Sequence, residues 1–400
     1  GITESRLQGL QETVIRESAW PEPRLLRFEK ETSGIEAGTV VFENGEIVFG
    51  YPKIRRSLML AAAIKRHFSE LVAVEEKMNG HNVRVLSLNG EIVALTRGGF
   101  ICPYSTDVAR RLVPEDIFEK HPHLVLCGEM VGPENPYVAK DIYPTDSIDF
   151  YLFDIAEKNG KSTLGVHKTH EMAEEFGLKA TAFFGEFHKE SAAERIKQIV
   201  IKLGRQGREG VVMKDPENKL APLKYTSSQT NCSDLAVAFR YYNDYALDFF
   251  VSRAVREGFQ SVEWNESEEE RRARALSLGE SILLPLIDTI ERKQRGENIV
   301  QEVQIRVKSL QAARDFEYHL RRSGIRAIFL LQKLGKRYGR SAEDFLWRRR
   351  IGVRIAKGSR DDDERIFSES TIPQFFRRRT WAEPSQCQSR HPICLAVNGA

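Results

Sequence analysis

One lysine in the sequence stands where an apolar segment ends, and this position suits a nucleophile. Residues 71–74 form an apolar run typical of a buried strand, and residues 83–86 resume that pattern after a glycine-containing turn. Lys77 therefore lies at the end of the first strand, directly after Glu75 and Glu76. An amine that attacks phosphorus needs rigid backbone behind it and little bulk in front of it, and this setting offers both. A solvated lysine in an ordinary hairpin turn is the alternative that these residues alone leave open.

Other charged and aromatic residues follow at the ends of later predicted strands or in the turns beside them. In chain order they are Arg97 and Phe100 in the segment TRGGF, Glu129 in GEMVGP, Phe153 in DFYLFDI, Glu209 and Lys214 in EGVVMK, and Lys224 in LKY. The two glycines of TRGGF allow backbone to approach a ligand closely. A buried strand over residues 123–127 is expected to project Glu129 into the loop that follows it. Taken singly, each residue has a plain explanation as a polar or aromatic residue at a strand end.

The protonation state of Lys77 decides whether it attacks. The amine must be neutral, whereas an isolated lysine has a pKa of about 10.4. Nearby cations disfavour the protonated form, and Lys214, Lys224 and Arg97 are the candidates for such a positive surround. The same charges would stabilise the negative charge that builds up on phosphorus in the transition state.

Composition sets the outer bounds on function. A chain of 400 residues has room for about two or three domains, and 41% hydrophobic with 29% charged residues describes a soluble globular protein. The five cysteines are scattered without C-x-x-C spacing, which indicates neither a zinc site nor a disulfide framework. With no membrane-length apolar run and no secretory leader in the sequence, a cytoplasmic protein is expected. A net charge of +3 permits a nucleic-acid partner without establishing one.

The elements that must position these residues alternate between helices and strands. Helical spacing marks residues 1–20, 58–68, 107–119 and 164–176, and strands are predicted over residues 40–42, 47–49, 92–95, 149–155, 209–214 and 223–225. The turns Asn44-Gly45 and Asn89-Gly90 both predict hairpins. The basic segment YPKIRR at residues 51–56 fits either a solvated loop or a polyphosphate contact. His167 and His170, on the last of these helices, lack a third ligand and are interpreted as ordinary helix residues.

Beyond residue 236 the pattern turns helical. Apolar residues with helical spacing cover residues 276–290, 300–310 and 316–334. Pro285 predicts a kink or break, and an exposed apolar stripe in this part would favour self-association. Residues 345–366 are rich in arginine and aspartate, and a solvated charged face is favoured there over RNA contact. Periodicity disappears from residue 371 onward, which predicts a poorly ordered tail.

Taken together, six elements in one order resemble the covalent nucleotidyltransferase superfamily of ATP-dependent ligases and capping enzymes. The order is K-x-x-G, an arginine loop, a glutamate segment, an aromatic strand, E-G-V-V-x-K and a lysine strand, over roughly residues 71–226. The stretches EEKMNGHNVR, TRGGF and CGEMVGPENPY are most similar to the archaeal-type, homodimeric ATP-dependent RNA ligases. Asn82 supports this resemblance, because RNA-end-joining relatives commonly have asparagine where DNA ligases and capping enzymes usually have arginine.

The resemblance implies an α+β fold whose adenylation domain combines antiparallel sheets with flanking helices. The implied parts are an N-terminal module with a β-hairpin at residues 1–56, the nucleotidyltransferase domain at 57–235, a helical C-terminal domain at 236–370 that would mediate dimerisation, and a tail at 371–400.

The resemblance also implies a role for each motif residue, with ATP as AMP donor and Mg²⁺ or Mn²⁺ as metal. By this resemblance Lys77 is the nucleophile, Asn82 assists later steps, and Glu209 binds the metal. Glu76 accepts the adenine amino group, Glu129 contacts the ribose, and Phe153 stacks on adenine. The nucleotide is also contacted by Arg97, Phe100, Lys214 and Lys224, of which Arg97 and Lys224 are catalytic as well. Many relatives have a K-x-K pair in the last motif, whereas Pro222 and Thr226 flank Lys224 here. Lys214 is expected to cover part of the missing lysine's role.

The implied reaction joins RNA 5′-phosphate and 3′-hydroxyl ends through a lysyl-AMP and an adenylated RNA end, with circularisation of RNA as one outcome. Two alternatives remain open on sequence alone. One is an ATP-dependent DNA ligase or a capping-type nucleotidyltransferase, against which Asn82, Glu76 and the helical C-terminal part argue. The other is an RNA-binding relative without turnover, against which the intact set of motif residues argues.

Overall fold

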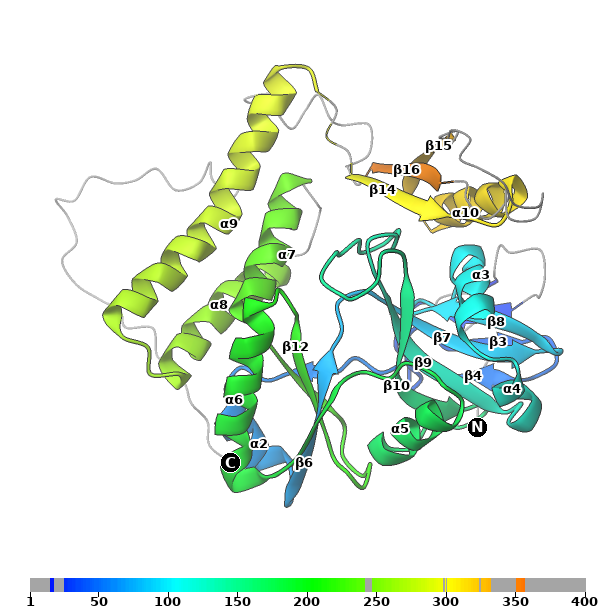
Figure 1. Ribbon diagram of the computed structural model, residues 1–400, viewed down its shortest axis with the longest axis horizontal. Helices are drawn as coiled ribbons and strands as arrows, with labels where there is room; N and C mark the ends of the chain where they lie inside the picture. Colours follow the sequence, from blue (N-terminus) through cyan, green and yellow to red (C-terminus); the bar gives the residue numbers. More distant parts are fainter. Residues whose placement is uncertain are drawn as a thin grey trace. The chain divides into compact units, whose positions relative to one another are not determined.

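The computed structural model describes residues 15–17, 25–241, 247–297, 299, 301–323, 325–331 and 350–356 (Figure 1). Its first sheet, near the N-terminus, is antiparallel and has the strand order β1-β2-β3-β4. Its strands are β1 (Ile15–Glu17), β2 (Leu25–Phe28), β3 (Val40–Phe42) and β4 (Ile47–Val48). The predicted hairpin between β3 and β4 is confirmed. Residues 1–14, which carry the first helical spacing, lie outside the described residues, and Ile15–Glu17 is a strand instead of a helix.

A second antiparallel sheet has the order β10-β9-β7-β8. It comprises β7 (His81–Leu88), β8 (Glu91–Thr96), β9 (Leu124–Val131) and β10 (Asp149–Glu157), with helices α3 (Pro103–Leu112), α4 (Asp116–Lys120) and α5 (Val166–Glu175) in the same part of the chain. The helix predicted over residues 107–119 is interrupted, because Pro114 disfavours helical backbone at Val113, whose φ and ψ are −107° and 119°. Since β9 extends to Val131, Glu129 lies inside a strand, and the prediction of a loop there is wrong.

The third sheet carries the predicted nucleophile and has the order β11-β6-β12-β13-β5. It comprises β5 (Arg55–Arg56), β6 (Leu71–Lys77), β11 (Phe183–His188), β12 (Gly210–Lys214) and β13 (Leu223–Thr226), with helices α2 (Leu60–His67) and α6 (Lys189–Arg205). Val72 and Val74 of β6 pack with Ile64 of α2 and Ile196 of α6 in one core. Because successive strand residues point to opposite faces, Lys77 points away from these helices.

The part of the chain after β13 begins with helices and then returns to strands. Its elements are α7 (Ser228–Arg240), α8 (Leu247–Glu263), α9 (Glu268–Gln294), β14 (Gln301–Arg306), α10 (Leu310–Arg322), β15 (Arg326–Leu331) and β16 (Arg350–Ala356). The helix predicted over 276–290 is confirmed, and α9 continues through Pro285 without the predicted break. None of the described helices is long and apolar enough to cross a membrane.

Two helix predictions in this part need correction. The segment predicted as helical at residues 300–310 is mainly β14, and the one at 316–334 combines the end of α10 with β15. The strands form a three-stranded antiparallel sheet with the order β14-β16-β15. Val303 and Ile305 are buried whereas Gln304 between them is exposed, so the spacing is that of a strand. Apart from β16, residues 332–400 lie outside the described residues, and so do the predicted tail and most of the charged segment.

Candidate active site

Lys77 is the last residue of β6 and lies between two carboxylates from other strands and loops. Its Nζ donates to Glu209 Oε2 at 3.0 Å and to the Met78 carbonyl at 3.3 Å. Burial alone would lower the pKa of Lys77, but the carboxylates of Glu209 and Glu129 outweigh that effect and hold the pKa above its usual value. The expected cationic surround therefore does not neutralise Lys77 in the protein by itself, and a ligand must change the charge balance first.

The glycine of the K-x-x-G segment lets the turn after Lys77 pass close to β9. A Cβ added at Gly80 would stand 2.0 Å from the Met130 carbonyl oxygen, so a larger residue collides with backbone. In this close approach the Gly80 amide donates to Glu129 Oε1 at 3.1 Å. Burial raises the pKa of Glu129 to about 7, although Lys77 opposes that shift. The glycine thus brings Glu129 close to Lys77.

A cavity of about 450 Å³ opens in front of Lys77 and is bordered by the second and third sheets. It collects most of the residues singled out in the sequence, namely Glu76, Lys77, Asn82, Arg97, Glu129, Phe153, Glu209, Lys214 and Lys224. Phe100 is not among the described residues that line it, because its ring lies under the Arg27 guanidinium at 3.9 Å. The Oδ1 atom of Asn82 is buried without a hydrogen-bond partner in the described part of the chain. It is an acceptor available to a ligand in this cavity.

A bulge in β10 directs Phe153 into the cavity. The pairing of β10 with β9 shifts register between Leu152 and Asp154, which leaves Phe153 unpaired at the bulge. The ring of Tyr51 meets that of Phe153 edge to face, with centroids 5.1 Å apart. Both residues line the cavity, so an aromatic surface is presented to whatever fills it.

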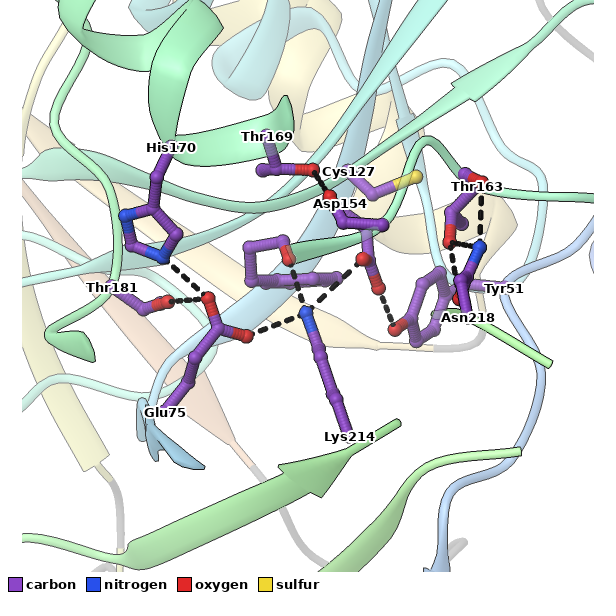
Figure 2. A network of polar contacts seen from close by, with 12 residues as sticks. Tyr51, Glu75, Cys127, Asp154, Thr163, Thr169, His170, Thr181, Lys214 and Asn218 are labelled. Carbon is purple, nitrogen blue, oxygen red and sulfur yellow. Dashed lines mark hydrogen bonds and ion pairs between the residues drawn. The ribbon is translucent and has the colours of Figure 1, made fainter. Parts of the chain in front are cut away.

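Lys214 lies at the centre of a buried network that Figure 2 shows from close by. Its Nζ contacts the Phe153 carbonyl at 2.5 Å, Asp154 Oδ1 at 3.1 Å and Glu75 Oε2 at 2.5 Å. An ammonium has three N–H donors, and these three acceptors take them all. Lys214 therefore has no donor left for a phosphate, which argues against its expected substitution for the missing lysine of the last motif.

The same network includes two residues to which the sequence assigned no role in the site. The Tyr51 hydroxyl donates to Asp154 Oδ2, and His170 Nε2 lies 2.6 Å from Glu75 Oε1 (Figure 2). Tyr51 comes from the loop before β5 and His170 from α5. A helix pattern with one histidine carries no signal for such a contact, because the partner is 95 residues away in the chain.

The Glu76 carboxylate lines the cavity and also pairs with an arginine. Arg208 Nη1 donates to both of its oxygens, at 2.8 and 2.7 Å, and the residue is 3% exposed. Glu75 shares the face of Lys77, since the two are two positions apart in one strand. Both glutamates line the cavity, and strand alternation puts Glu75 on the face that carries Lys77.

The position of Lys77, at a strand end and in the lining of this cavity, is the one that a covalent nucleotidyltransferase needs for its lysine. Comparison with known proteins agrees with this class. Residues 70–226 match the RNA ligase family, and residues 237–341 match the C-terminal region of ligase Pab1020. The chain belongs to the family of archaeal ATP-dependent RNA ligases.

Individual relatives cover most of the chain. A solved structure described as an archaeal ATP-dependent RNA ligase, form 1, is 41% identical with a TM-score of 0.81, over 90% of this chain and 93% of that one. A putative ATP-dependent DNA ligase from Aquifex aeolicus is 25% identical with a TM-score of 0.79, over 88% and 94%. An uncharacterized protein of Methanocaldococcus jannaschii is 40% identical over 298 residues, which are 73% of this chain and 75% of that protein.

Proposed function

We propose that this protein joins RNA 5′-phosphate and 3′-hydroxyl ends with ATP, through an AMP bound covalently to Lys77. The observation that carries the proposal is the position of Lys77, fixed at the end of β6 in the mouth of the cavity, between Glu129 and Glu209. Lys77 attacks the α-phosphate and pyrophosphate leaves. The AMP then passes to the RNA 5′-phosphate, and a 3′-hydroxyl displaces AMP to close the strand. Splitting one displacement into several easier ones is the advantage of a covalent intermediate.

Glu129 and Glu209 fit a divalent metal, with Mg²⁺ as the proposed ion. No group of three or more His, Cys, Asp or Glu in the described residues could hold a metal. Mg²⁺ does not need one, because it commonly binds one or two carboxylates together with waters and substrate phosphates. Burial raises the pKa of Glu129 to about 7, and a cation beside it would favour its ionised form. When bound, Mg²⁺ neutralises phosphate charge and disfavours the protonated form of Lys77.

We propose that adenine stacks on Phe153 and that Glu75, in place of Glu76, accepts its amino group. Offset stacking on the ring contributes about 1 kcal/mol beyond burial. Glu75 is held by Lys214 and His170 and still has acceptor capacity, since a carboxylate has about four lone-pair positions. Guanine presents a carbonyl where adenine presents the amino group, so labelled GTP should form no adduct. An adduct of equal yield from GTP would contradict this role of Glu75.

Lys224 gives the ATP complex a pH dependence. Burial lowers the pKa of Lys224 to about 8, and nearby Lys77, Arg56 and Arg97 add to that effect. The side chain is charged below that pH and loses its charge as pH rises through it. We expect ATP affinity, measured by calorimetry, to fall above about pH 8. Lys224→Arg keeps its charge at all these pH values, so its affinity should stay level there. An equal fall in both proteins would contradict the contact.

We propose a homodimer formed through α8 and α9. Most of the large apolar side chains exposed on the described residues lie on these two helices, including Val262, Leu276, Leu283, Leu284 and Ile287. Exposed apolar side chains that form a contiguous patch are typical of an interface. Light scattering should give twice the chain mass of 45.7 kDa. Leu283→Glu with Leu284→Glu should give monomers, whereas Leu58→Glu, at an exposed position before α2, should leave the dimer intact.

The activity is tested by incubating the protein with Mg²⁺ and ATP labelled at the α-phosphate, then with RNA or DNA ends. A label that stays on denatured protein, followed by joining of 5′-phosphate RNA, is the expected result. Circular products would resist exonuclease. Joining of DNA ends alone would contradict the proposed substrate. A folded protein, free of bound AMP, that acquires no label would contradict the ligase mechanism altogether.

A further inference from the structure

Arg56 lies beside Lys224 on the face of the third sheet that carries the active site. The strand registers pair Glu75 with Val212, Val212 with Lys224, and Lys224 with Arg56. Residues directly opposite one another in neighbouring strands point to the same face of a sheet. One row therefore runs from Glu75 across the sheet to Arg56, which lies on the edge strand β5.

The Arg56 guanidinium is partly buried and makes no hydrogen bond or ion pair with the part of the chain that the structure describes. The Nζ of Lys224 likewise makes no hydrogen bond or ion pair with the described residues, and the residue is also partly buried. Arginines on the neighbouring helix α8 differ, since Arg253 donates to Asp234 at 3.2 and 2.6 Å and Arg256 donates to Thr226. A partly desolvated cation without an anion is costly, and two adjacent ones call for a negatively charged ligand.

Carboxylates near Arg56 are already engaged elsewhere. Glu209 and Asp234 are the acidic groups whose charges act on Arg56, and Arg253 acts on it with the opposite sign. Glu209 pairs with Lys77 at 3.0 Å and Asp234 pairs with Arg253 at 2.6 Å. The space between Lys224 and Arg56 therefore carries excess positive charge. Lys214 does not contribute donors there, because its three contacts lie in the buried network.

The strand order puts the cations in a sequence across the sheet. Lys77 lies on β6, Lys224 two strands away on β13, and Arg56 one strand further on β5. At about 4.8 Å between strands, Lys224 stands about 10 Å and Arg56 about 14 Å from the strand of the nucleophile. A phosphate bound between Lys224 and Arg56 is thus on the far side of Lys224 from Lys77.

We propose that Arg56 and Lys224 form a phosphate subsite that holds the pyrophosphate of ATP in the first step and the RNA 5′-phosphate in the second. This inference rests on the proposed function. In this subsite Arg56 takes the place of the second lysine of the last motif. It comes from the neighbouring strand β5 instead of from β13 itself.

In-line displacement explains why one subsite serves both phosphates. In the first step the neutral Nζ of Lys77 bonds to phosphorus and loses a proton to solvent. The bond from phosphorus to the bridging oxygen breaks, and its electron pair leaves on pyrophosphate opposite Lys77. In the second step an oxygen of the RNA 5′-phosphate bonds to the same phosphorus and Lys77 leaves as the amine, taking a proton. The entering phosphate therefore approaches from the side that pyrophosphate vacated.

The experiment compares Arg56→Ala and Arg56→Gln with Arg55→Ala, a matched control on the same strand whose side chain is exposed on the other face. Each protein is first checked for folding by thermal unfolding. Adduct formation from labelled ATP measures the first step, and single-turnover transfer from preformed lysyl-AMP protein to 5′-phosphate RNA measures the second. Arg56→Lys keeps the positive charge but lacks the paired N–H donors of the guanidinium, so it should recover part of any rate that Arg56→Ala loses.

We expect both steps to slow by about 10- to 100-fold in Arg56→Ala and Arg56→Gln, and by less than about 2-fold in Arg55→Ala. Folded Arg56 variants with both rates at the control level would overturn the subsite. A loss confined to one step would overturn its shared use. If the unaltered protein itself forms no adduct, the proposed function fails; if it does and the Arg56 variants match it, only the subsite fails.

Discussion

Lys77→Ala should acquire covalent AMP at least about 10³-fold more slowly than the unaltered protein, because no other described side chain lies where it could replace the Lys77 amine. The structure supports so large an effect because Lys77 closes β6 and meets the cavity between Glu129 and Glu209. The measurement is the label from α-labelled ATP that remains on denatured protein. Lys65→Ala, on the exposed side of α2, is a control that should label normally.

The same variant separates the nucleophile from the rest of the site. RNA that already carries a 5′-adenylate bypasses the lysyl-AMP, so Lys77→Ala should still join it, provided that the cavity remains intact. Because the change leaves Glu209 without its 3.0 Å partner, thermal unfolding should be recorded alongside. Normal labelling of Lys77→Ala would exclude this residue as the nucleophile. Loss of both activities in a folded variant would assign Lys77 a further part in strand joining.

Lys214→Met should lower the free energy of unfolding by about 3 to 5 kcal/mol, the range seen when one partner of a buried ion pair is removed. Lys214 is 7% exposed and contacts both Glu75 and Asp154, which are themselves buried. Without the ammonium, two carboxylates remain desolvated and close together. Urea denaturation at neutral pH measures the effect. Lys219→Met, an exposed lysine in the same segment, should change little.

The pH dependence of that loss tests its cause. Burial would raise the pKa of Glu75, but Lys214 and His170 hold it below the usual 4.5. A lowered carboxyl pKa adds stability above the unfolded value and loses it as pH falls. In Lys214→Met this contribution is missing, so the gap from the unaltered protein should narrow as pH falls below about 4.5. A gap that stays constant with pH would assign the loss to packing alone.

Much of this architecture is readable from local patterns. The apolar run before Lys77, the Asn-Gly hairpins and the order of the six motif segments depend on residues close in sequence, and period-two alternation follows from strand geometry. These features predict Lys77 as the nucleophile and name most of the residues that the structure brings together around its cavity. They are less decisive after residue 294, where Val303 and Ile305 fit either a helix or a strand until their partners in the three-stranded sheet are known.

The remaining features of the site depend on partners that are distant in the chain. Glu75 and Glu76 both precede Lys77 and both line the cavity, but Glu75 pairs there with Lys214 and Glu76 with Arg208. Lys214 appears available to a phosphate until Glu75 and Asp154 are seen to hold it. Arg56 and Lys224 become neighbours through the parallel pairing of β5 with β13. The physical reason is that the protonation state of a side chain, and its availability to a ligand, depend on its burial and on the groups within a few ångströms of it. The order of residues in the chain determines neither.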